Sequence, residues 1–247
     1  MSDSTYQTRS LDWPNCLNIR DLGGLPTPDN GVTKWQAVIR SDLVNDLNAD
    51  GQQMLLDYGV RTTIDLRAPR EVEKKPSIYQ NQSEGLIHYV NQPLEHFYPH
   101  VGELISNASS RGEVYCIILD HYADLICSAL RLIANADEGG VLIHCQAGKD
   151  RTGTISALLL KLVGVEDDVI AADYAESQAN LWPIYEKAVE QAGGAEQVGF
   201  WSQPSVTADM MHLMLDHVAG RYGDVESYSI QAGMTTVELD KIKKRLR

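Results

Sequence analysis

The stretch VLIHCQAGKDRTG, residues 141–153, decides the fold of this chain of 247 residues. The run at 140–143 is short, apolar and preceded by glycine, which is typical of a buried strand covered on both faces. From Arg151 the sequence RTGTISALLLKLVG is apolar all round and ends at Gly164, which predicts a buried helix with a glycine stop. Residues 145–150 are therefore predicted to form a loop from strand to helix.

Such a loop is suited to binding an anion. Successive backbone N–H groups converge there, and the helix N-terminus adds a positive partial charge. Arg151, six positions after Cys145, is expected to return to the mouth of the loop and hold two phosphate oxygens, which lysine cannot do. The same surroundings favour the thiolate form of a cysteine. We therefore expect Cys145 to be a nucleophile beneath a bound phosphate.

The motif Cys-x5-Arg, with His144 before it and Thr152 after it, resembles the signature of the cysteine-dependent protein tyrosine phosphatase superfamily. The longer form HCQAGKDRTG, with Lys149 and Asp150, is similar to that of the atypical bacterial tyrosine-protein phosphatases. Those enzymes also act on phosphoserine, phosphothreonine and phosphoinositides. Five further blocks extend the resemblance in the same order: NIRDLGG (18–24), VIRSDL (38–43), VRTTIDLR (60–67) with Glu71 after it, DYAES (173–177) and the tail at 221–247.

The resemblance implies a phosphatase that works through a phosphocysteine intermediate. Cys145 would attack phosphorus, while Arg151 and the loop amides would stabilise the equatorial oxygens. The loop as a whole is expected to bind the phosphate. Its members are Gln146, Ala147, Gly148, Lys149, Asp150 and Arg151. No metal or organic cofactor is implied.

An acid must protonate the leaving oxygen, and Asp150 is our candidate. Many tyrosine phosphatases carry this acid on a separate loop, which here would offer Glu95. We place Asp150 ahead of Glu95, Asp65 and Asp120, because the phosphate dianion and the thiolate favour its protonated form.

Three residues are expected to support the loop. His144 precedes the nucleophile and, by strand alternation, points away from the substrate, so we expect it to position the loop. Thr152 is expected to donate to the thiolate. Asp65, with Arg67, ends a predicted strand at the same edge as Cys145, and it is equally compatible with the rim of the site and with a surface salt bridge.

Two further charged stretches leave alternatives open. Lys149 suggests a site that accepts substrates with extra phosphates, and a lysine solvated at the edge of the loop explains it equally well. Arg20 and Asp21 are predicted to form a structural ion pair beside a glycine turn. The stretch 180–215 is predicted to be a helical lid or insertion, although its tryptophans would more often simply anchor a helix on the core.

The length suits a single phosphatase domain, 1–247, with 1–15 as an N-terminal extension. The four cysteines and seven histidines show no spacing typical of a zinc site or a disulfide framework, so a reducing, cytoplasmic location is expected, with export without a signal left open. No apolar run approaches the roughly 20 residues of a membrane span. A formal charge of −13 argues against nucleic acid as a partner.

Periodicity predicts strands at 34–40, 60–67, 85–90 and 140–145, and helices after Asn48, around 113–135, at 151–163 and at 166–179. Strands alternating with helices indicate an α/β fold, with a central, mainly parallel sheet flanked by helices on both faces. This architecture is protein-tyrosine-phosphatase-like, with a mostly helical C-terminal part from 181 onward. A capping box at 235–238 opens the last predicted helix.

The predicted partners are a phosphorylated protein or phosphoinositide substrate, with inorganic phosphate as the product. Phosphotyrosine is the first expectation for the substrate. Two other functions compete with this one. A catalytically silent phosphate-binding module would use the same loop, but the intact Cys145, Asp150 and Arg151 count against it. Sulfur transfer by a loop cysteine explains neither Arg151 nor the Thr-Gly start of the helix.

Overall fold

The computed structural model describes residues 8–80, 86–96, 98–200, 203 and 205–247. Residues 1–7 of the predicted N-terminal extension and residues 201, 202 and 204 of the predicted lid therefore lie outside the described residues, as does Gly85 of the third predicted strand.

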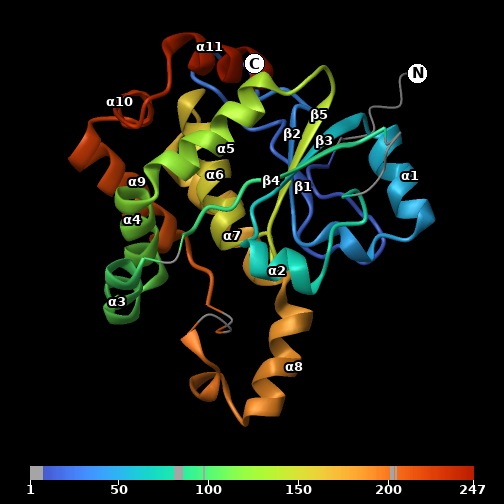
Figure 1. Cartoon of the computed structure of the whole chain (residues 1–247), viewed down its shortest axis with the longest axis vertical. Coiled ribbons are helices and arrows are strands. Elements are labelled where there is room, and N and C mark those ends of the chain that lie inside the picture. The colour runs from blue at the N-terminus through green and yellow to red at the C-terminus, as the bar shows by residue number, and fades with distance from the viewer. Residues whose placement is uncertain (1–7, 81–85, 97, 201–202, 204) are drawn as a thin grey trace.

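A mainly parallel sheet of five strands forms the centre of the protein (Figure 1). Its strands are β1 (Arg20–Asp21), β2 (Val38–Ser41), β3 (Val60–Asp65), β4 (His88–Asn91) and β5 (Gly140–His144). Their order is β1-β2-β5-β3-β4, and only β1 runs antiparallel to its neighbour. This confirms the predicted sheet and places the strand of the signature at its middle.

Eleven α-helices are found among the described residues. They are α1 (Ala49–Asp57), α2 (Pro69–Lys74), α3 (Pro99–Asn107), α4 (Arg111–His121), α5 (Ala123–Asn135), α6 (Asp150–Leu162), α7 (Asp167–Asn180), α8 (Trp182–Ala192), α9 (Ala208–Tyr222), α10 (Val225–Gln231) and α11 (Thr236–Leu246). Short 3-10 turns lie at Val44–Asp46 and Ala195–Gln197. The helical C-terminal part is confirmed, and so is the capping box that opens α11.

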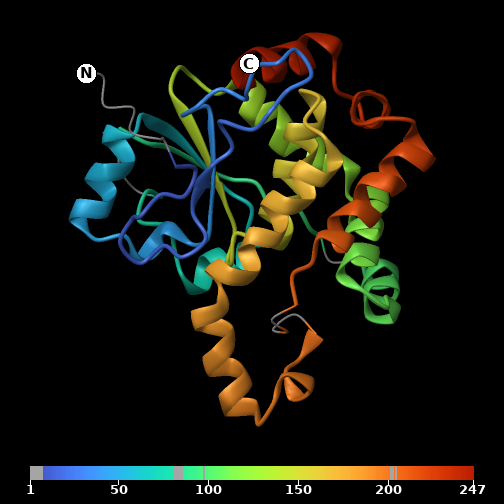
Figure 2. The same ribbon diagram turned by 180° about the vertical axis from the view of Figure 1, so that it is seen from behind.

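Apolar residues of β5 alternate between two cores, one on each face of the sheet. Val141 and Ile143 pack into the larger core, which α5, α6 and the C-terminal helices complete. Leu142 packs into the smaller core with Leu55 of α1 and Trp13. Figure 2 shows α6 and α7 on the face opposite to α1. Strand alternation therefore puts Cys145 on the larger-core side and His144 on the other.

Two predicted elements differ most from the observed ones, and the strand predicted at 85–90 is observed at His88–Asn91. The helical segment around 113–135 is two helices, because Tyr122 leaves helical geometry with φ −125° and ψ 29°. The strand predicted from residue 34 begins at Val38, because Gln36 takes a left-handed conformation with φ 61° and donates its backbone N–H to Asp21. The hydrogen bond from the Gln36 N–H to the Asp21 side chain thus delays the start of the strand, although the local sequence has a β pattern.

The segment from α8 to α9 projects from the body of the protein at the edge where β5 ends (Figures 1 and 2). α8 begins directly after α7 and ends at Gly193, which has φ 80°. Its Trp182 is 43% exposed, so it does not anchor the helix on the core, and Trp201 lies outside the described residues. Within the described part of the chain, no helix combines the length and the apolar character needed to span a bilayer.

Candidate active site

The phosphate loop, residues 145–151, leaves the sheet at its centre and runs into α6. His144 pairs in register with Ser41 of β2 and Asp65 of β3, so the ends of three parallel strands meet beneath the loop. Gly148 has φ 62°, and a side chain there would collide with the backbone of Ser41 and Asp42. The loop therefore requires glycine at this position.

Backbone carbonyls of the phosphate loop are held from outside. Leu43 donates its backbone N–H to the carbonyl of Gln146 at 3.2 Å. Asn18 Nδ2 donates to the carbonyl of Ala147, and Arg40 Nη2 donates to that of Gly148, both at 2.9 Å.

The backbone N–H groups of 146–151 donate to no acceptor in the described part of the chain. They are therefore free to bind the oxygens of an anion, as the sequence predicts. Cys145 lies buried beneath them, with 2% of its surface exposed. The hydroxyl of Thr152 is also buried and has no hydrogen-bond partner among the described residues, so it is free to donate at the start of α6.

Arg151 is oriented by α2, a role that the sequence did not indicate. Its Nη1 and Nη2 donate to the two carboxylate oxygens of Glu71 at 2.5 and 3.0 Å, and the backbone N–H of Ala68 binds Glu71 in turn. Burial opposes the guanidinium charge of Arg151, but the hydrogen bonds to Glu71 and the negative charges of Cys145, Glu71 and Glu95 together raise the pKa of Arg151. The arginine is thus charged and preset beside Cys145.

Asp65 and Arg67 lie beneath the loop. Their side chains are fully buried, with Arg67 Nη2 at 2.7 Å from Asp65 Oδ2, so the interpretation as a surface salt bridge is wrong. The charged end of β3 is covered by Tyr89 of β4, whose hydroxyl donates to Asp65 at 3.0 Å. Burial tends to raise the pKa of Asp65, but the hydrogen bonds from Arg67 and the positive charges nearby together lower it.

His144 is buried next to this pair. Its Nε2 lies 3.9 Å from Asp65 Oδ2, and its Nδ1 lies 3.3 Å from the carbonyl of Cys145. Burial lowers the pKa of His144, so the ring is neutral near pH 7. It lies on the face opposite to Cys145, as the strand alternation predicts, and its role in positioning the loop stays a prediction.

Asp150 is oriented by two tyrosines. Its Oδ1 accepts a hydrogen bond from the hydroxyl of Tyr115 on α4, and the hydroxyl of Tyr174 on α7 lies 2.6 Å from that of Tyr115. The other candidate acids differ. Glu95 lies 3.8 Å from Arg151, and its side chain is 39% exposed. Asp120 is bound by α9, through His217 and Tyr222.

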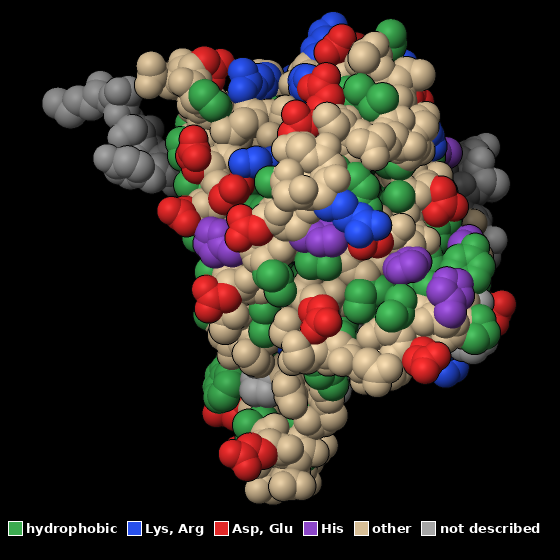
Figure 3. Space-filling view, turned by 90° about the vertical axis from the view of Figure 1, so that its left-hand side faces the viewer, with side chains coloured by type: hydrophobic (Ala, Val, Ile, Leu, Met, Phe, Trp, Pro, Cys, Tyr) green, Lys and Arg blue, Asp and Glu red, His purple; other side chains and the backbone are tan. Residues whose placement is uncertain are grey.

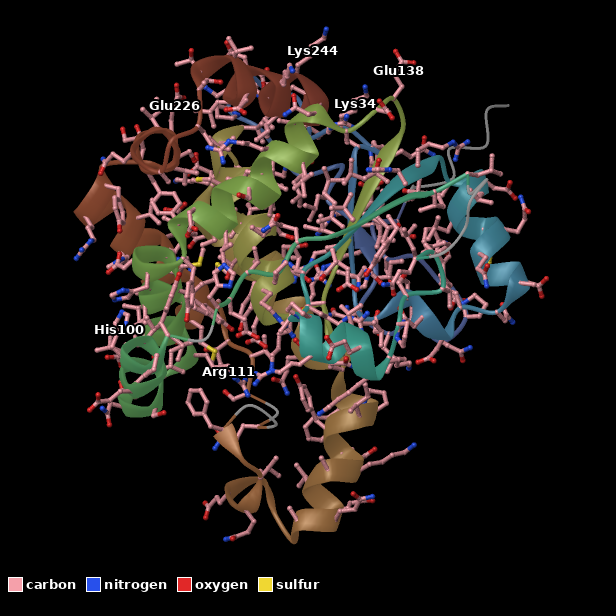
Figure 4. The ribbon with its side chains drawn as sticks, in the orientation of Figure 1. Lys34, His100, Arg111, Glu138, Glu226 and Lys244 are labelled. Carbon is pink, nitrogen blue, oxygen red and sulfur yellow. The ribbon has the colours of Figure 1, made fainter. Side chains whose placement is uncertain are left out.

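Lys149 is buried, with 1% of its surface exposed, so the interpretation as a solvated loop residue is wrong. Its Nζ donates to the hydroxyl of Tyr185 on α8 at 2.9 Å and lies 3.6 Å from Asp150 Oδ2. Burial lowers the pKa of Lys149. The segment after α8 is held by Arg111, which is labelled in Figure 4. Its guanidinium donates to the carbonyls of Phe200, Gln203 and Ser205.

The prediction that Arg20 and Asp21 pair with each other is wrong. Adjacent strand residues point to opposite faces, so the two side chains cannot meet. Arg20 Nε donates to Asp173 Oδ1 at 3.0 Å, and Arg40 Nη1 donates to Asp173 Oδ2 at 2.5 Å. Burial opposes the charge of Asp173, but the arginines outweigh it and lower the pKa of Asp173. Asp21 instead accepts from Tyr58 and from the backbone.

Two surface features complete the surroundings of the site. A cavity of about 480 Å³ opens beside Glu95, between α2 and α3, and is lined in part by Arg70, Tyr98 and Tyr122. Histidines are spread over the face that carries α3, α4 and α9, with acidic side chains among them (Figure 3). No cluster of side chains suited to holding a metal ion occurs in the described ranges.

Several known proteins are similar to this chain. A model of the tyrosine phosphatase family matches residues 11–247. A tyrosine-protein phosphatase of Nostoc commune is 29% identical over 223 residues, which cover 85% of this chain and 74% of that protein. The triple specificity protein phosphatase PtpB of Mycobacterium tuberculosis is 24% identical over 271 residues, covering 93% and 96%. Among solved structures, TpbA of P. aeruginosa has a TM-score of 0.39 at 20% identity, covering 80% of this chain and 86% of TpbA.

Proposed function

Since the chain belongs to the tyrosine phosphatase family, we propose that it dephosphorylates phosphotyrosine in proteins through a phosphocysteine formed on Cys145. The observation that carries this proposal is the phosphate loop itself. Its backbone N–H groups have no acceptor in the described chain, its cysteine is buried beneath them, and its Arg151 is held in place by Glu71. A phosphate dianion supplies the acceptors and the charge that this arrangement lacks.

In the first step the Cys145 thiolate attacks phosphorus opposite the tyrosyl oxygen. The S–P bond forms as the P–O bond to tyrosine breaks, and Arg151 and the loop amides bind the three equatorial oxygens. Asp150 gives its proton to the departing tyrosyl oxygen. In the second step Asp150 takes a proton from water as the water oxygen attacks phosphorus. The S–P bond breaks, Thr152 donates to the thiolate, and inorganic phosphate leaves.

Asp150 is favoured over Glu95 as the acid by its contacts. It stands inside the phosphate loop, next to Arg151, and a buried tyrosine fixes its carboxylate. Glu95 faces Arg151 from the solvent side, where its charge assists Glu71 in holding the guanidinium. Asp65 is enclosed by Arg67, Tyr89 and the sheet, so it cannot reach a substrate.

We extend the substrate range to phosphoserine, phosphothreonine and phosphoinositides. Lys149 supports the extension, because it is a second cation of the phosphate loop and its Nζ is held by the neutral hydroxyl of Tyr185. The name of the M. tuberculosis relative, a triple specificity phosphatase, points the same way. We further propose that residues 180–215 act as a lid over the phosphate loop. A reducing, cytoplasmic compartment suits the free Cys145.

Turnover tests the reaction. The wild type should hydrolyse p-nitrophenyl phosphate and phosphotyrosine peptides, and a panel with phosphoserine, phosphothreonine and phosphoinositides should rank the substrates. Cys145→Ser should abolish turnover but keep binding of phosphotyrosine peptide, because the loop amides and Arg151 supply most of the affinity.

Cys127→Ser is the matched control, since Cys127 is buried in α5, away from the loop. More than a trace of wild-type kcat in Cys145→Ser would rule out the phosphocysteine. A wild type that binds phosphotyrosine peptide without turnover would support the silent binding module instead.

A further inference from the structure

We propose that Tyr115, held by Tyr174, is a positioning residue that decides which oxygen of Asp150 carries the catalytic proton. The inference rests on the proposed role of Asp150 as the general acid. Tyr115 donates to Oδ1, so the transferable proton must be on Oδ2, the oxygen turned toward Lys149. Both tyrosines are buried, so they act through Asp150.

The two tyrosines come from separate helices and are fixed in the larger core. Tyr115 on α4 and Tyr174 on α7 are buried, and their rings meet edge to face with centroids 6.0 Å apart. Both belong to the apolar cluster that packs against the sheet. Rings held in this way cannot follow a moving carboxylate, so they hold Asp150 in one rotamer.

The signature itself contains a residue that makes room for this pair. A Cβ atom at Gly153, the last residue of HCQAGKDRTG, would lie 3.0 Å from Cδ2 of Tyr174. That separation is tighter than most real side-chain contacts, so the absence of a side chain lets Tyr174 approach α6. The phosphate loop and the tyrosine pair are thus fitted to each other.

The direction of the hydrogen bonds among Tyr174, Tyr115 and Asp150 follows from which of these groups carry a proton. Burial raises the pKa of both tyrosines, so each hydroxyl keeps its proton. An ionised Asp150 has no proton to give, so Tyr115 must donate to it and can then accept from Tyr174. The other neighbour of the Tyr174 hydroxyl is Met210 Sδ at 3.8 Å, a weak acceptor. The chain therefore runs from Tyr174 through Tyr115 to Asp150.

When Asp150 is protonated, Oδ1 still accepts from Tyr115, because the reversed chain would have to end on the weak acceptor Met210 Sδ. The proton consequently resides on Oδ2, whose neighbour Lys149 at 3.6 Å is too far for a normal hydrogen bond and cannot accept one. In the second step the same oxygen is the one free to take a proton from water. A phenylalanine in place of Tyr115 would remove this distinction between the two oxygens.

Leaving-group dependence tests the proposal. In Tyr115→Phe, kcat for phenyl phosphate should fall about tenfold, whereas kcat for 2,4-dinitrophenyl phosphate, whose leaving group needs little acid help, should stay within about twofold. KM should change little. Tyr174→Phe, which keeps the direct bond to Asp150, should show the same pattern with a loss of about threefold, and it serves if Tyr115→Phe fails to fold.

Tyr228→Phe is the matched control, because it removes an equally buried hydroxyl that binds the carbonyl of Leu119 in α4. It should keep the wild-type leaving-group slope, that is, the dependence of log kcat on the pKa of the leaving group. In an Asp150→Asn background, Tyr115→Phe should cause no further loss for phenyl phosphate, since the tyrosine acts only through the acid.

Two results would overturn the proposal in distinguishable ways. An Asp150→Asn enzyme with the leaving-group slope of the wild type would remove the acid assigned in the proposed function, and the positioning role with it. A steeper slope in Asp150→Asn, together with an equal loss for both aryl phosphates in Tyr115→Phe, would keep the acid and remove only the role of Tyr115.

Discussion

The phosphate loop is bounded by two regions that hold it in different ways. On one side stands the arginine wall, Arg20, Arg40 and Asp173, where buried charges meet at hydrogen-bond distance and Arg40 continues to the carbonyl of Gly148. The other boundary is the α8 side, Lys149 and Tyr185 with the segment held by Arg111. There the loop meets α8 through a hydrogen bond to a neutral hydroxyl.

Buried ion pairs on one side and a hydrogen bond to a neutral hydroxyl on the other indicate that the two regions have different roles. Separating buried opposite charges leaves each of them unpaired in a medium that solvates them poorly, so the arginine wall should be rigid. A hydrogen bond between an ammonium and a neutral hydroxyl is weaker and can be exchanged for one to water or substrate. We therefore expect the arginine wall to fix the amide cradle and the α8 side to adapt to what is bound.

The largest effect is expected for Asp173→Asn in the arginine wall. The change leaves Arg20 and Arg40 buried without their carboxylate, which should lower the free energy of unfolding by about 3–5 kcal/mol. Urea denaturation measures it. Asp46→Asn is the control, because Asp46 pairs with Lys75 in the open, and an exposed pair contributes only about 0–1 kcal/mol. Equal losses in the two variants would mean that the wall is not rigidly paired.

The same substitution has a pH signature. The pKa of Asp173 is lower in the folded protein than its ordinary value of 3.8, so its stabilisation is present above that value and is lost as the pH falls below it. The wild type should therefore lose more stability than Asp173→Asn between about pH 5 and pH 3. If the free energy of unfolding fell equally in the two proteins over this pH range, the Asp173 carboxylate would not be the group that stabilises the wall.

An intermediate effect is expected at Glu71, which pairs with Arg151 in a partly exposed position. Glu71→Gln keeps one acceptor oxygen but loses the charge and the second hydrogen bond, so Arg151 should be less well oriented. We expect kcat/KM for phosphotyrosine peptide to fall about tenfold, which corresponds to about 1.4 kcal/mol. Glu73→Gln, on the exposed side of α2, should leave it unchanged. If the two variants behave alike, Glu71 does not orient Arg151.

The sequence predicts the phosphate loop because its parts are contiguous. A strand, a glycine-containing turn and a helix that follow one another fix where Cys145 and Arg151 stand, and the structure agrees on each element. The predicted strands and helices also occur in the predicted order, since each carries its own periodicity, but β1, α2 and α3 were not predicted. Local chemistry therefore sufficed for the fold class and for the position of the loop that carries Cys145 and Arg151.

Residues that hold the loop from a distance were not predicted. Arg40 and Asp173 are 133 positions apart, Glu71 and Arg151 are 80 apart, and no local pattern pairs them. The error at Arg20 and Asp21 could have been avoided from the sequence, because neighbouring residues of a strand point to opposite faces and cannot pair. For Asp65 and Arg67 the pairing was recognised but the burial was not, because it depends on Tyr89 from the neighbouring strand.

The smallest effect should lie on the α8 side. Burial raises the pKa of Tyr185 to about 12, so its hydroxyl is neutral and accepts from Lys149. A substrate with a second phosphate has to displace this hydroxyl before it can bind the ammonium. Phosphotyrosine makes no such demand, because the loop amides and Arg151 complete its site. Tyr185→Phe therefore separates the two kinds of substrate.

In Tyr185→Phe, KM for a phosphoinositide should fall about threefold, because the ammonium of Lys149 is left without an acceptor and gains more from a phosphate oxygen. KM for phosphotyrosine peptide should stay within about twofold, and kcat should not change. Tyr79→Phe, which removes a buried hydroxyl in the smaller core, should match the wild type on both substrates. In a Lys149→Met background the difference between the substrates should disappear. An equal change of KM for both substrates would mean that α8 merely packs against the loop, and that its contact with Lys149 is as fixed as the arginine wall.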